Sequence, residues 1–355
     1  MDHQTAKTGP ADTSIFPDKA SINNAAITAA DGETTMNKLL KTLALAGVSS
    51  MAFASAAMAE IRTERVTFQS GGQTLVGTLY IPDGVTARNQ APGVVVTGAW
   101  MTIKEQMPAV YARELAQRGI VALAFDFRTW GESGGTQRSM EDPAMKIADI
   151  KAAATFLDRR AETARGQIGG LGICASAGYM VHAAADSRVI RSVALVAPWL
   201  HDAAIVNTVY GAENVTNLTR LATVAQAKFA AAGELSLVPA AGPQGSAAVM
   251  AGVPYYTETD RGAITQWENT FNVASWDDWL SFDAQAAAPK LKDAFLMVHS
   301  QAAAIPQGAT QFFANLTGQK EQVWLDNVSQ FDFYDRAAPV KAASDAAARH
   351  FQSTL

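Results

Sequence analysis

The sequence predicts an α/β fold, in which helices cover both faces of a mostly parallel, doubly wound sheet, and three observations support this. Apolar runs rich in β-branched residues, such as those within 91–100 and 120–128, are typical of strands buried on both faces. Apolar residues at helical spacing lie between them, as in Met107, Tyr111 and Leu115. The two patterns then alternate strictly, as right-handed strand–helix–strand crossovers require.

The predicted elements begin with an antiparallel hairpin at 65–84, because two alternating apolar runs meet at Gly71-Gly72. The helix containing Met107 is predicted to end at Gly119, since glycine is favoured just past a helix C-terminus. Buried strands and helices then follow in order. Strands are predicted at 120–128, 167–173 and 189–199, with helices at 147–157 and 175–186.

Residues 200–289 interrupt the alternation and are predicted to form a lid inserted into one core, which consists of 60–199 and 290–355. A helical stretch at 217–233 falls inside the insertion. The core resumes with strands at 294–300 and 321–327 and helices at 308–316 and from Ala337. Five aromatic residues of the insertion either line a pocket or bury the lid on the core: Trp267, Trp276, Trp279, Tyr255 and Tyr256.

The N-terminal region has the layout of an export signal. Residues 36–59 contain two lysines, an apolar run at 43–54 and the small-residue site Ala57-Met58-Ala59, which together are typical of a secretory signal peptide. The apolar run is too short for a stable membrane anchor. Residues 1–35 are polar and unpatterned, so they are predicted to be a disordered extension, with Met36 as the working start. The mature protein is therefore expected in the periplasm or outside the cell.

Composition excludes several classes of partner. The formal net charge is −5 and no dense Lys/Arg cluster is visible, so nucleic acid is not expected as a partner. No His/Cys/Asp/Glu group has metal-ligand spacing, and no metal or other cofactor is predicted. GLGICA fits the G-x-G-x-x-A dinucleotide pattern, but it lies on about the fifth strand, whereas that motif belongs on the first. The single cysteine, Cys174, cannot form a disulfide within the chain.

Cys174 lies where a strand is predicted to turn sharply into a helix. Such a turn needs small residues two positions away on each side, and Gly172 and Ser176 meet that need. The turn should raise the sulfur over the carboxyl edge of the sheet, where open α/β folds bind ligands. A helix start favours a thiolate, so we expect partial ionisation near neutral pH. Ser176 is the alternative nucleophile, although it is predicted inside the helix.

Three motifs carry a resemblance to a known family: GLGICAS, VVVTGAW after the hairpin, and FDFRTWGESGG. With them the chain resembles the α/β-hydrolase superfamily, in particular its cysteine-containing members such as dienelactone hydrolase and X-Pro dipeptidyl peptidase-like enzymes. The resemblance implies the α/β-hydrolase fold. It also implies an oxyanion hole formed by the N–H of Ala175 and a second N–H at Ala99 or Trp100.

The chain departs from that family at two positions. The family's histidine follows the last strand, where this sequence has Gln330, and its acid follows the preceding strand, where Gln301 and alanines stand. Glutamine cannot accept a proton at any accessible pH. The ordinary catalytic triad is therefore absent from the sequence.

Two other histidines remain as candidates for the base. His201, followed by Asp202, comes after the strand at 189–199 at the same predicted sheet edge as Cys174; the alternative is that it tethers the start of the lid. His299 ends a buried strand and is either a ligand contact or a structural residue. Trp199 is a further possible ligand contact.

These observations lead to two functional hypotheses. The first is an exported hydrolase in which Cys174 attacks an ester, thioester or related acyl substrate, with His201 as base and Asp202 beside it. Its substrate is a small, partly apolar molecule, because the lid is aromatic. The second is a non-catalytic binding protein on a hydrolase fold, with Gln301 and Gln330 as hydrogen-bonding groups for the ligand.

Overall fold

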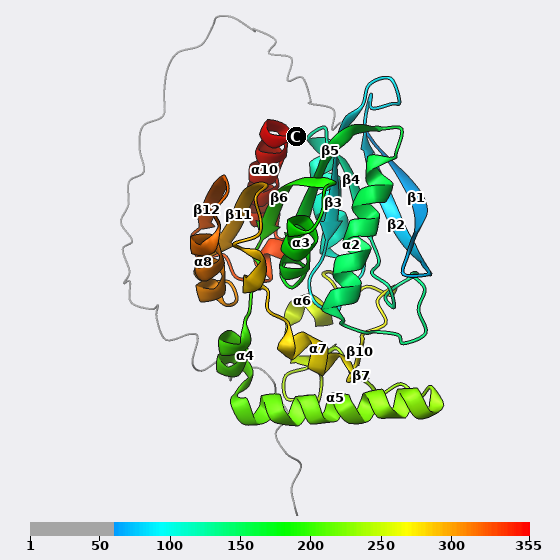
Figure 1. Ribbon diagram of the computed structural model, residues 1–355, viewed down its shortest axis with the longest axis vertical. Helices are drawn as coiled ribbons and strands as arrows, with labels where there is room; N and C mark the ends of the chain where they lie inside the picture. The colour runs from blue at the N-terminus through cyan, green and yellow to red at the C-terminus, as the bar shows by residue number, and fades with distance from the viewer. Residues whose placement is uncertain (1–59) are drawn as a thin grey trace, which may run out of the picture. The chain divides into compact units, whose positions relative to one another are not determined.

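A mixed sheet of eight strands forms the centre of the protein (Figure 1), for which the computed structural model describes residues 60–355. The strand order is β1-β2-β4-β3-β5-β6-β11-β12. The first two strands pair antiparallel, β2 is antiparallel to β4, and all later pairs are parallel. The predicted doubly wound, mostly parallel sheet with an antiparallel start is thus confirmed.

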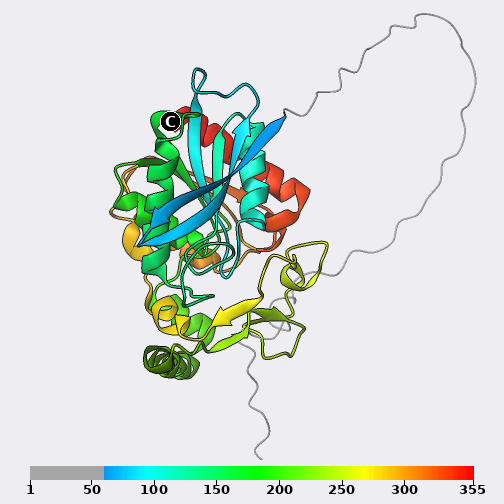
Figure 2. The same ribbon diagram turned by 90° about the vertical axis from the view of Figure 1, so that its right-hand side faces the viewer.

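The strands of this sheet are β1 (Ile61–Ser70), β2 (Gln73–Pro82), β3 (Ala91–Thr97), β4 (Val121–Phe125), β5 (Thr163–Ile173), β6 (Ile190–Val196), β11 (Ala294–Ser300) and β12 (Lys320–Leu325). Helices α2 (Pro143–Asp158), α3 (Ser176–Ala185) and α8 (Pro306–Asn315) cover one face. Helices α1 (Met107–Gln117) and α10 (Ala337–Thr354) pack together on the other (Figure 2). A short α9 (Asp332–Asp335) precedes α10.

Cover on both faces explains the continuous apolar runs. Val94, Val95 and Val96 of β3 are fully buried although their side chains alternate between the two faces. Helix α2 begins where the sequence offers both a capping side chain and a proline: Asp142 accepts a hydrogen bond from the Met145 N–H, and Pro143 follows at the first helical position. Local sequence signals and tertiary burial therefore agree in the core.

The insertion between β6 and β11 lies at one end of the sheet (Figures 1 and 2). It contains α4 (Ala203–Tyr210), α5 (Ala212–Ala232), α6 (Pro254–Thr257), α7 (Ser275–Ser281), η2 (Gln285–Ala287) and the small sheets of β7 (Leu237–Pro239) with β10 (Thr270–Asn272) and of β8 (Ala241–Gly242) with β9 (Met250–Ala251). All five lid aromatics predicted from the sequence are buried, with at most 7% of their surface exposed. They pack the lid against the core.

The predicted signal peptide at 36–59 and the extension at 1–35 lie outside the described residues. Within residues 60–355, none of the helices combines the length and the apolar character needed to cross a bilayer.

His299 shows what burial alone does to a titratable side chain. It lies on β11, fully buried, with its ring 5.1 Å from the ring of Trp324. Neither ring nitrogen has a hydrogen-bond partner among the described residues. Burial lowers the pKa of His299 to about 4, because a charged imidazolium would lose its hydration without a compensating partner.

We expect His299 to make the folded state sensitive to acid. The unfolded chain binds a proton at this residue near pH 6.5, whereas the folded chain resists it until about pH 4, so its contribution to stability is fully present above pH 6.5 and is lost as pH falls towards 4. His299→Leu should remove up to about 3 kcal/mol of that loss. Thermal unfolding of both proteins between pH 7 and pH 4 measures it, and parallel pH dependence in the two proteins would contradict it.

Candidate active site

The chain turns sharply at Cys174, between the end of β5 and the start of α3. Cys174 has a φ of +55°, in the left-handed region that non-glycine residues seldom adopt. A Cβ atom on Gly172 would lie 2.8 Å from the Cα of Ala177, so the strand and the helix approach too closely for any larger residue. The Ser176 hydroxyl donates to the carbonyl of Ile173 and is buried. These contacts give Ser176 a role in the turn and disfavour it as a nucleophile.

The sulfur of Cys174 lies among hydrogen-bond donors but almost out of reach of water. The residue is 8% exposed. Burial raises the pKa of its thiol, and hydrogen bonds from the Tyr334 hydroxyl, the Ala175 and Trp100 backbone N–H groups and the Gln330 side chain lower it by less. The net pKa is raised, so the expected ionisation near neutral pH is corrected: desolvation outweighs the helix start and the donors.

The backbone N–H groups near the sulfur include one donor from each of the two segments that were predicted to form the oxyanion hole. Ala175 and Trp100 both act on the Cys174 sulfur, from the start of α3 and from the loop after β3. The N–H of Ala99, the other predicted candidate, points instead to the Met107 sulfur at 3.5 Å. Trp100 is therefore the candidate that the geometry favours.

Gln330, which the sequence predicts at the position of the family's histidine, is tied into the protein on both sides of its amide. Its Oε1 accepts from the Ala304 N–H at 3.0 Å, and its Nε2 donates to the Ala197 carbonyl at 2.9 Å. Nε2 also lies 3.1 Å from the Tyr334 hydroxyl. Since its hydrogen-bonding groups have partners within the protein, Gln330 holds Tyr334 in place beside the sulfur.

The structure does not bring His201 into use as a base. Its Nδ1 accepts from the Trp199 indole N–H at 2.9 Å and its Nε2 donates to the Trp279 carbonyl at 3.1 Å, so both nitrogens are occupied. Burial lowers the pKa of His201 to about 4. The prediction of His201 as base is corrected on these grounds, and its contact with Trp279 fits the alternative, a tether for the lid.

The remaining predicted residues also have other surroundings than expected. Asp202 caps α4, accepting from the Ile205 N–H at 2.9 Å, and its other oxygen accepts from Gln311 at 3.0 Å, so it does not orient His201. Gln301 is exposed in the turn after β11, away from the buried groups at Cys174. Trp199 donates its backbone N–H to the Cys174 carbonyl at 2.9 Å and thereby supports the turn.

Two tyrosines belong to the site, and the sequence singled out only one of them. Tyr334, fully buried, follows Gln330 by four residues, a spacing that brings side chains together along helical backbone. That spacing in SQFDFYD was an available signal. Tyr256 of α6, predicted as a lid aromatic, hydrogen-bonds with Tyr334. The pKa of both tyrosines is raised well above its usual value, first by burial, so neither can serve as a base.

Aromatic rings close the site on the lid side. The Trp100 ring stacks on Trp279, with ring centres 4.9 Å apart, and lies 5.4 Å from Trp276 and 5.2 Å from Phe271. Offset and tilted ring pairs of this kind contribute about 0.5–1.5 kcal/mol each beyond the area they bury. The lid thus packs directly on the residue that supplies the second N–H group.

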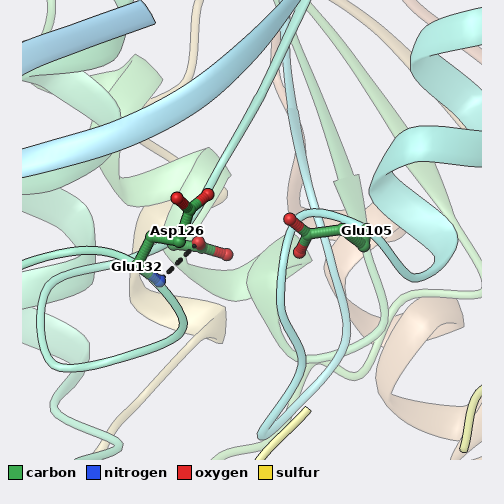
Figure 3. A group of neighbouring side chains, drawn as sticks. All are labelled: Glu105, Asp126 and Glu132. Atoms are coloured by element: carbon green, nitrogen blue, oxygen red, sulfur yellow. Dashed lines mark hydrogen bonds between the residues drawn. The ribbon is translucent and has the colours of Figure 1, made fainter. Parts of the chain in front are cut away.

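A cluster of three carboxylates lies where the loop after β3 meets the loop after β4 (Figure 3). Ligand atoms of Glu105, Asp126 and Glu132 lie within 4.8 Å of one another, a spacing that could hold a metal ion. The ammonium group of Lys104 lies 2.6 Å from Glu105 and Glu132 and 2.7 Å from Asp126. Burial would lower the pKa of Lys104, but the three carboxylates raise it above its usual value. We therefore assign the cluster to loop structure.

A second ion pair lies beside this cluster. Asp126 pairs with Lys104, and Arg128 pairs with the buried Asp149 of α2 at 2.6 Å. The loop after β4 is thus held at two points by partners that are distant in sequence.

Comparison with known proteins gives relatives along most of the chain. No family model matches. The chain is 29% identical to the uncharacterized protein PA2218 of Pseudomonas aeruginosa over 78% of its length and 77% of that protein, and 26% identical to the uncharacterized protein YcjY of Escherichia coli over 79% and 95%. A thiohydrolase of Eupenicillium brefeldianum is 31% identical over 38% of this chain and 42% of its own.

Solved structures identify the fold. The crystal structure of PA2218 is similar with a TM-score of 0.70 and 24% identity, over 89% of this chain and all of that one. The α/β hydrolase GrgF from a Penicillium species gives 0.69 at 19% identity, over 83% and 99%. A dienelactone hydrolase from Anabaena variabilis gives 0.51 at 14%, over 83% and 99%. The protein has the α/β-hydrolase fold, as the resemblance implied.

The close approach at Gly172 yields a test of the turn. Gly172→Ala should destabilise the protein by about 1–3 kcal/mol, because the added methyl group meets backbone atoms that cannot move aside cheaply. Gly134→Ala is the control, since its Cβ would first meet the end of the flexible Gln73 side chain. Urea unfolding of the three proteins measures the difference, and equal midpoints would count against the strained turn.

Proposed function

We propose that the protein is a hydrolase of ester, thioester or related acyl substrates, with Cys174 as its nucleophile. One observation carries the proposal: the sulfur lies at a left-handed turn between a strand and a helix, facing the backbone N–H groups of Ala175 and Trp100. The α/β-hydrolase fold and the similarity to a protein named thiohydrolase support the same class of reaction.

The chemistry follows from these groups. The Cys174 thiolate attacks the carbonyl carbon, an S–C bond forms, and the carbonyl electrons move to oxygen, where the N–H groups of Ala175 and Trp100 stabilise the negative charge. Collapse expels the leaving group as an alkoxide or thiolate, which takes a proton from water. Water then attacks the carbonyl carbon of the acyl-enzyme, the C–S bond breaks, and the carboxylic acid and the Cys174 thiol are formed.

The proton of the Cys174 thiol goes to solvent. Among the described residues, His201 has both nitrogens in other hydrogen bonds, and Gln330 cannot accept a proton. The reaction rate therefore follows the fraction of thiolate that solvent equilibrium provides. A slow reaction at neutral pH is the consequence.

The substrate proposed is a small molecule with an apolar acyl group, because the rings of Trp100, Trp279 and Trp276 surround the loop that bears the second N–H group. Since Cys174 is only 8% exposed, the lid must move for the substrate to enter. The proposal includes export to the periplasm or the outside of the cell, which rests on the sequence of residues 36–59.

The pH dependence of Cys174 alkylation tests the state of the thiol. Because burial raises the pKa of the Cys174 thiol above its ordinary value, the rate with iodoacetamide at pH 7 should be below about 3% of the plateau and should still rise steeply in the alkaline range. p-Nitrophenyl acetate at pH 9 should release a burst of p-nitrophenolate equal to the enzyme concentration. Cys174→Ser, the closest control in shape, should lose the burst.

Ligand binding without turnover is the second candidate function, and the raised pKa of the Cys174 thiol favours it. The same burst experiment separates the two. A wild-type protein without any burst at pH 9 would sink the hydrolase proposal and leave the binding function.

Gln330→His tests whether the site lacks only a base. An imidazole at this position, beside the sulfur, should stabilise the thiolate and lower the alkylation midpoint by about one pH unit or more. Gln330→Ala is the control for the loss of the amide contacts and should not lower the midpoint. If the two variants gave the same midpoint, position 330 would lie outside the reach of the sulfur.

A further inference from the structure

The loop that carries Trp100 is held in an unusual conformation. Met101, its next residue, has a φ of +60°, and a left-handed non-glycine residue costs about 1 kcal/mol or more. Such a conformation persists only where the surroundings fix it. Here three side chains do so, two of them from distant parts of the chain, one peptide group at a time.

Three consecutive peptide groups each have a side-chain partner. The Thr102 hydroxyl donates to the Ala99 carbonyl at 2.7 Å, in the same peptide group as the Trp100 N–H. The Glu141 carboxylate accepts from the Met101 N–H at 2.7 Å. The Trp267 indole donates to the Met101 carbonyl at 2.7 Å. The direction of the Trp100 N–H is thus fixed from both sides.

Glu141 is the unexpected member of this set, because it is a fully buried carboxylate. Its charge is balanced by the Lys146 ammonium, itself 2% exposed, and Tyr179 donates to it at 3.2 Å. A buried ion pair is a weak source of stability, since desolvation consumes most of the attraction. What the pair does provide is a strong hydrogen-bond acceptor, the Glu141 carboxylate, at the Met101 N–H.

We propose that Glu141 is a positioning residue of the oxyanion hole. By holding the peptide group between Trp100 and Met101, it keeps the Trp100 N–H directed at the substrate carbonyl oxygen beside Cys174. The catalytic part of this inference rests on the proposed function. The arrangement also applies to the unreacted protein, because the Trp100 N–H acts on the Cys174 sulfur there. It assigns a purpose to the Glu141–Lys146 pair, which the hydrolase chemistry itself does not use.

The lid takes part in the same arrangement. Trp267 belongs to the insertion, and Ser275, at the start of α7, accepts from the Glu141 backbone N–H at 2.9 Å. Gln106, near the loop, donates to the Gly262 carbonyl of the insertion at 2.7 Å. Seating of the lid therefore completes the set of contacts that directs the Trp100 N–H.

A pair of double variants isolates the acceptor from the charge. Glu141→Gln/Lys146→Met keeps a side-chain oxygen for the Met101 N–H, whereas Glu141→Leu/Lys146→Met removes it, and neither leaves an unpaired buried charge. The second variant should show an iodoacetamide midpoint about half a pH unit or more above that of the first, because the Trp100 N–H no longer stabilises the thiolate. Its acylation by p-nitrophenyl acetate should be roughly 10- to 100-fold slower.

Equal alkylation midpoints in the two double variants would overturn the inference, whatever the acylation rates show. If the wild-type protein reacts with iodoacetamide but is never acylated by p-nitrophenyl acetate, the proposed function is overturned instead. The pH midpoints of alkylation in the two double variants still decide the role of Glu141. If the leucine variant fails to fold, Thr102→Val against Thr102→Ser applies the same comparison to the neighbouring peptide group. The valine variant should then show the higher midpoint, and equal midpoints would overturn the arrangement.

Discussion

The close approach of β5 and α3 at Gly172 is the constraint on which the site depends. It forces Cys174 into a left-handed conformation and lifts the sulfur towards the start of α3, where backbone N–H groups have no partner within the helix. The second N–H, from Trp100, reaches the same sulfur only because the parallel pairing of β3 and β5 sets the two strand ends side by side. The sheet thus determines the geometry, and the loops refine it.

Burial acts on this site in two opposite ways. The aromatic lid excludes water, which raises the pKa of the Cys174 thiol and favours its neutral form. The same exclusion strengthens every hydrogen bond to a charge that develops inside, because no solvent screens it. With the lid closed, the sulfur is therefore held as a neutral thiol, while the N–H groups that would stabilise an oxyanion remain in place.

The sequence predicted the sheet, the insertion and the turn at Cys174 because these depend on local patterns: apolar periodicity, small residues and strand–helix alternation. It also drew attention to Gln330, and the structure places that side chain beside the Tyr334 hydroxyl. It could not predict the direction of a ring: His201 lies after the expected strand, yet one of its nitrogens binds the carbonyl of the lid residue Trp279 and the other binds the Trp199 indole. Long-range partners, such as Glu141 for Met101, are chosen by how loops cross in space, which spacing along the chain does not encode.

The Lys104 ammonium, enclosed by Glu105, Asp126 and Glu132, has a consequence for the surroundings in which the protein can work. Carboxylates at such spacing could instead hold a dissolved metal ion, whose occupancy would vary with supply and with competing chelators. An ammonium group that is covalently part of the chain cannot be diluted or sequestered. The loops at the ends of β3 and β4 thus carry this positive charge whatever salts the medium contains.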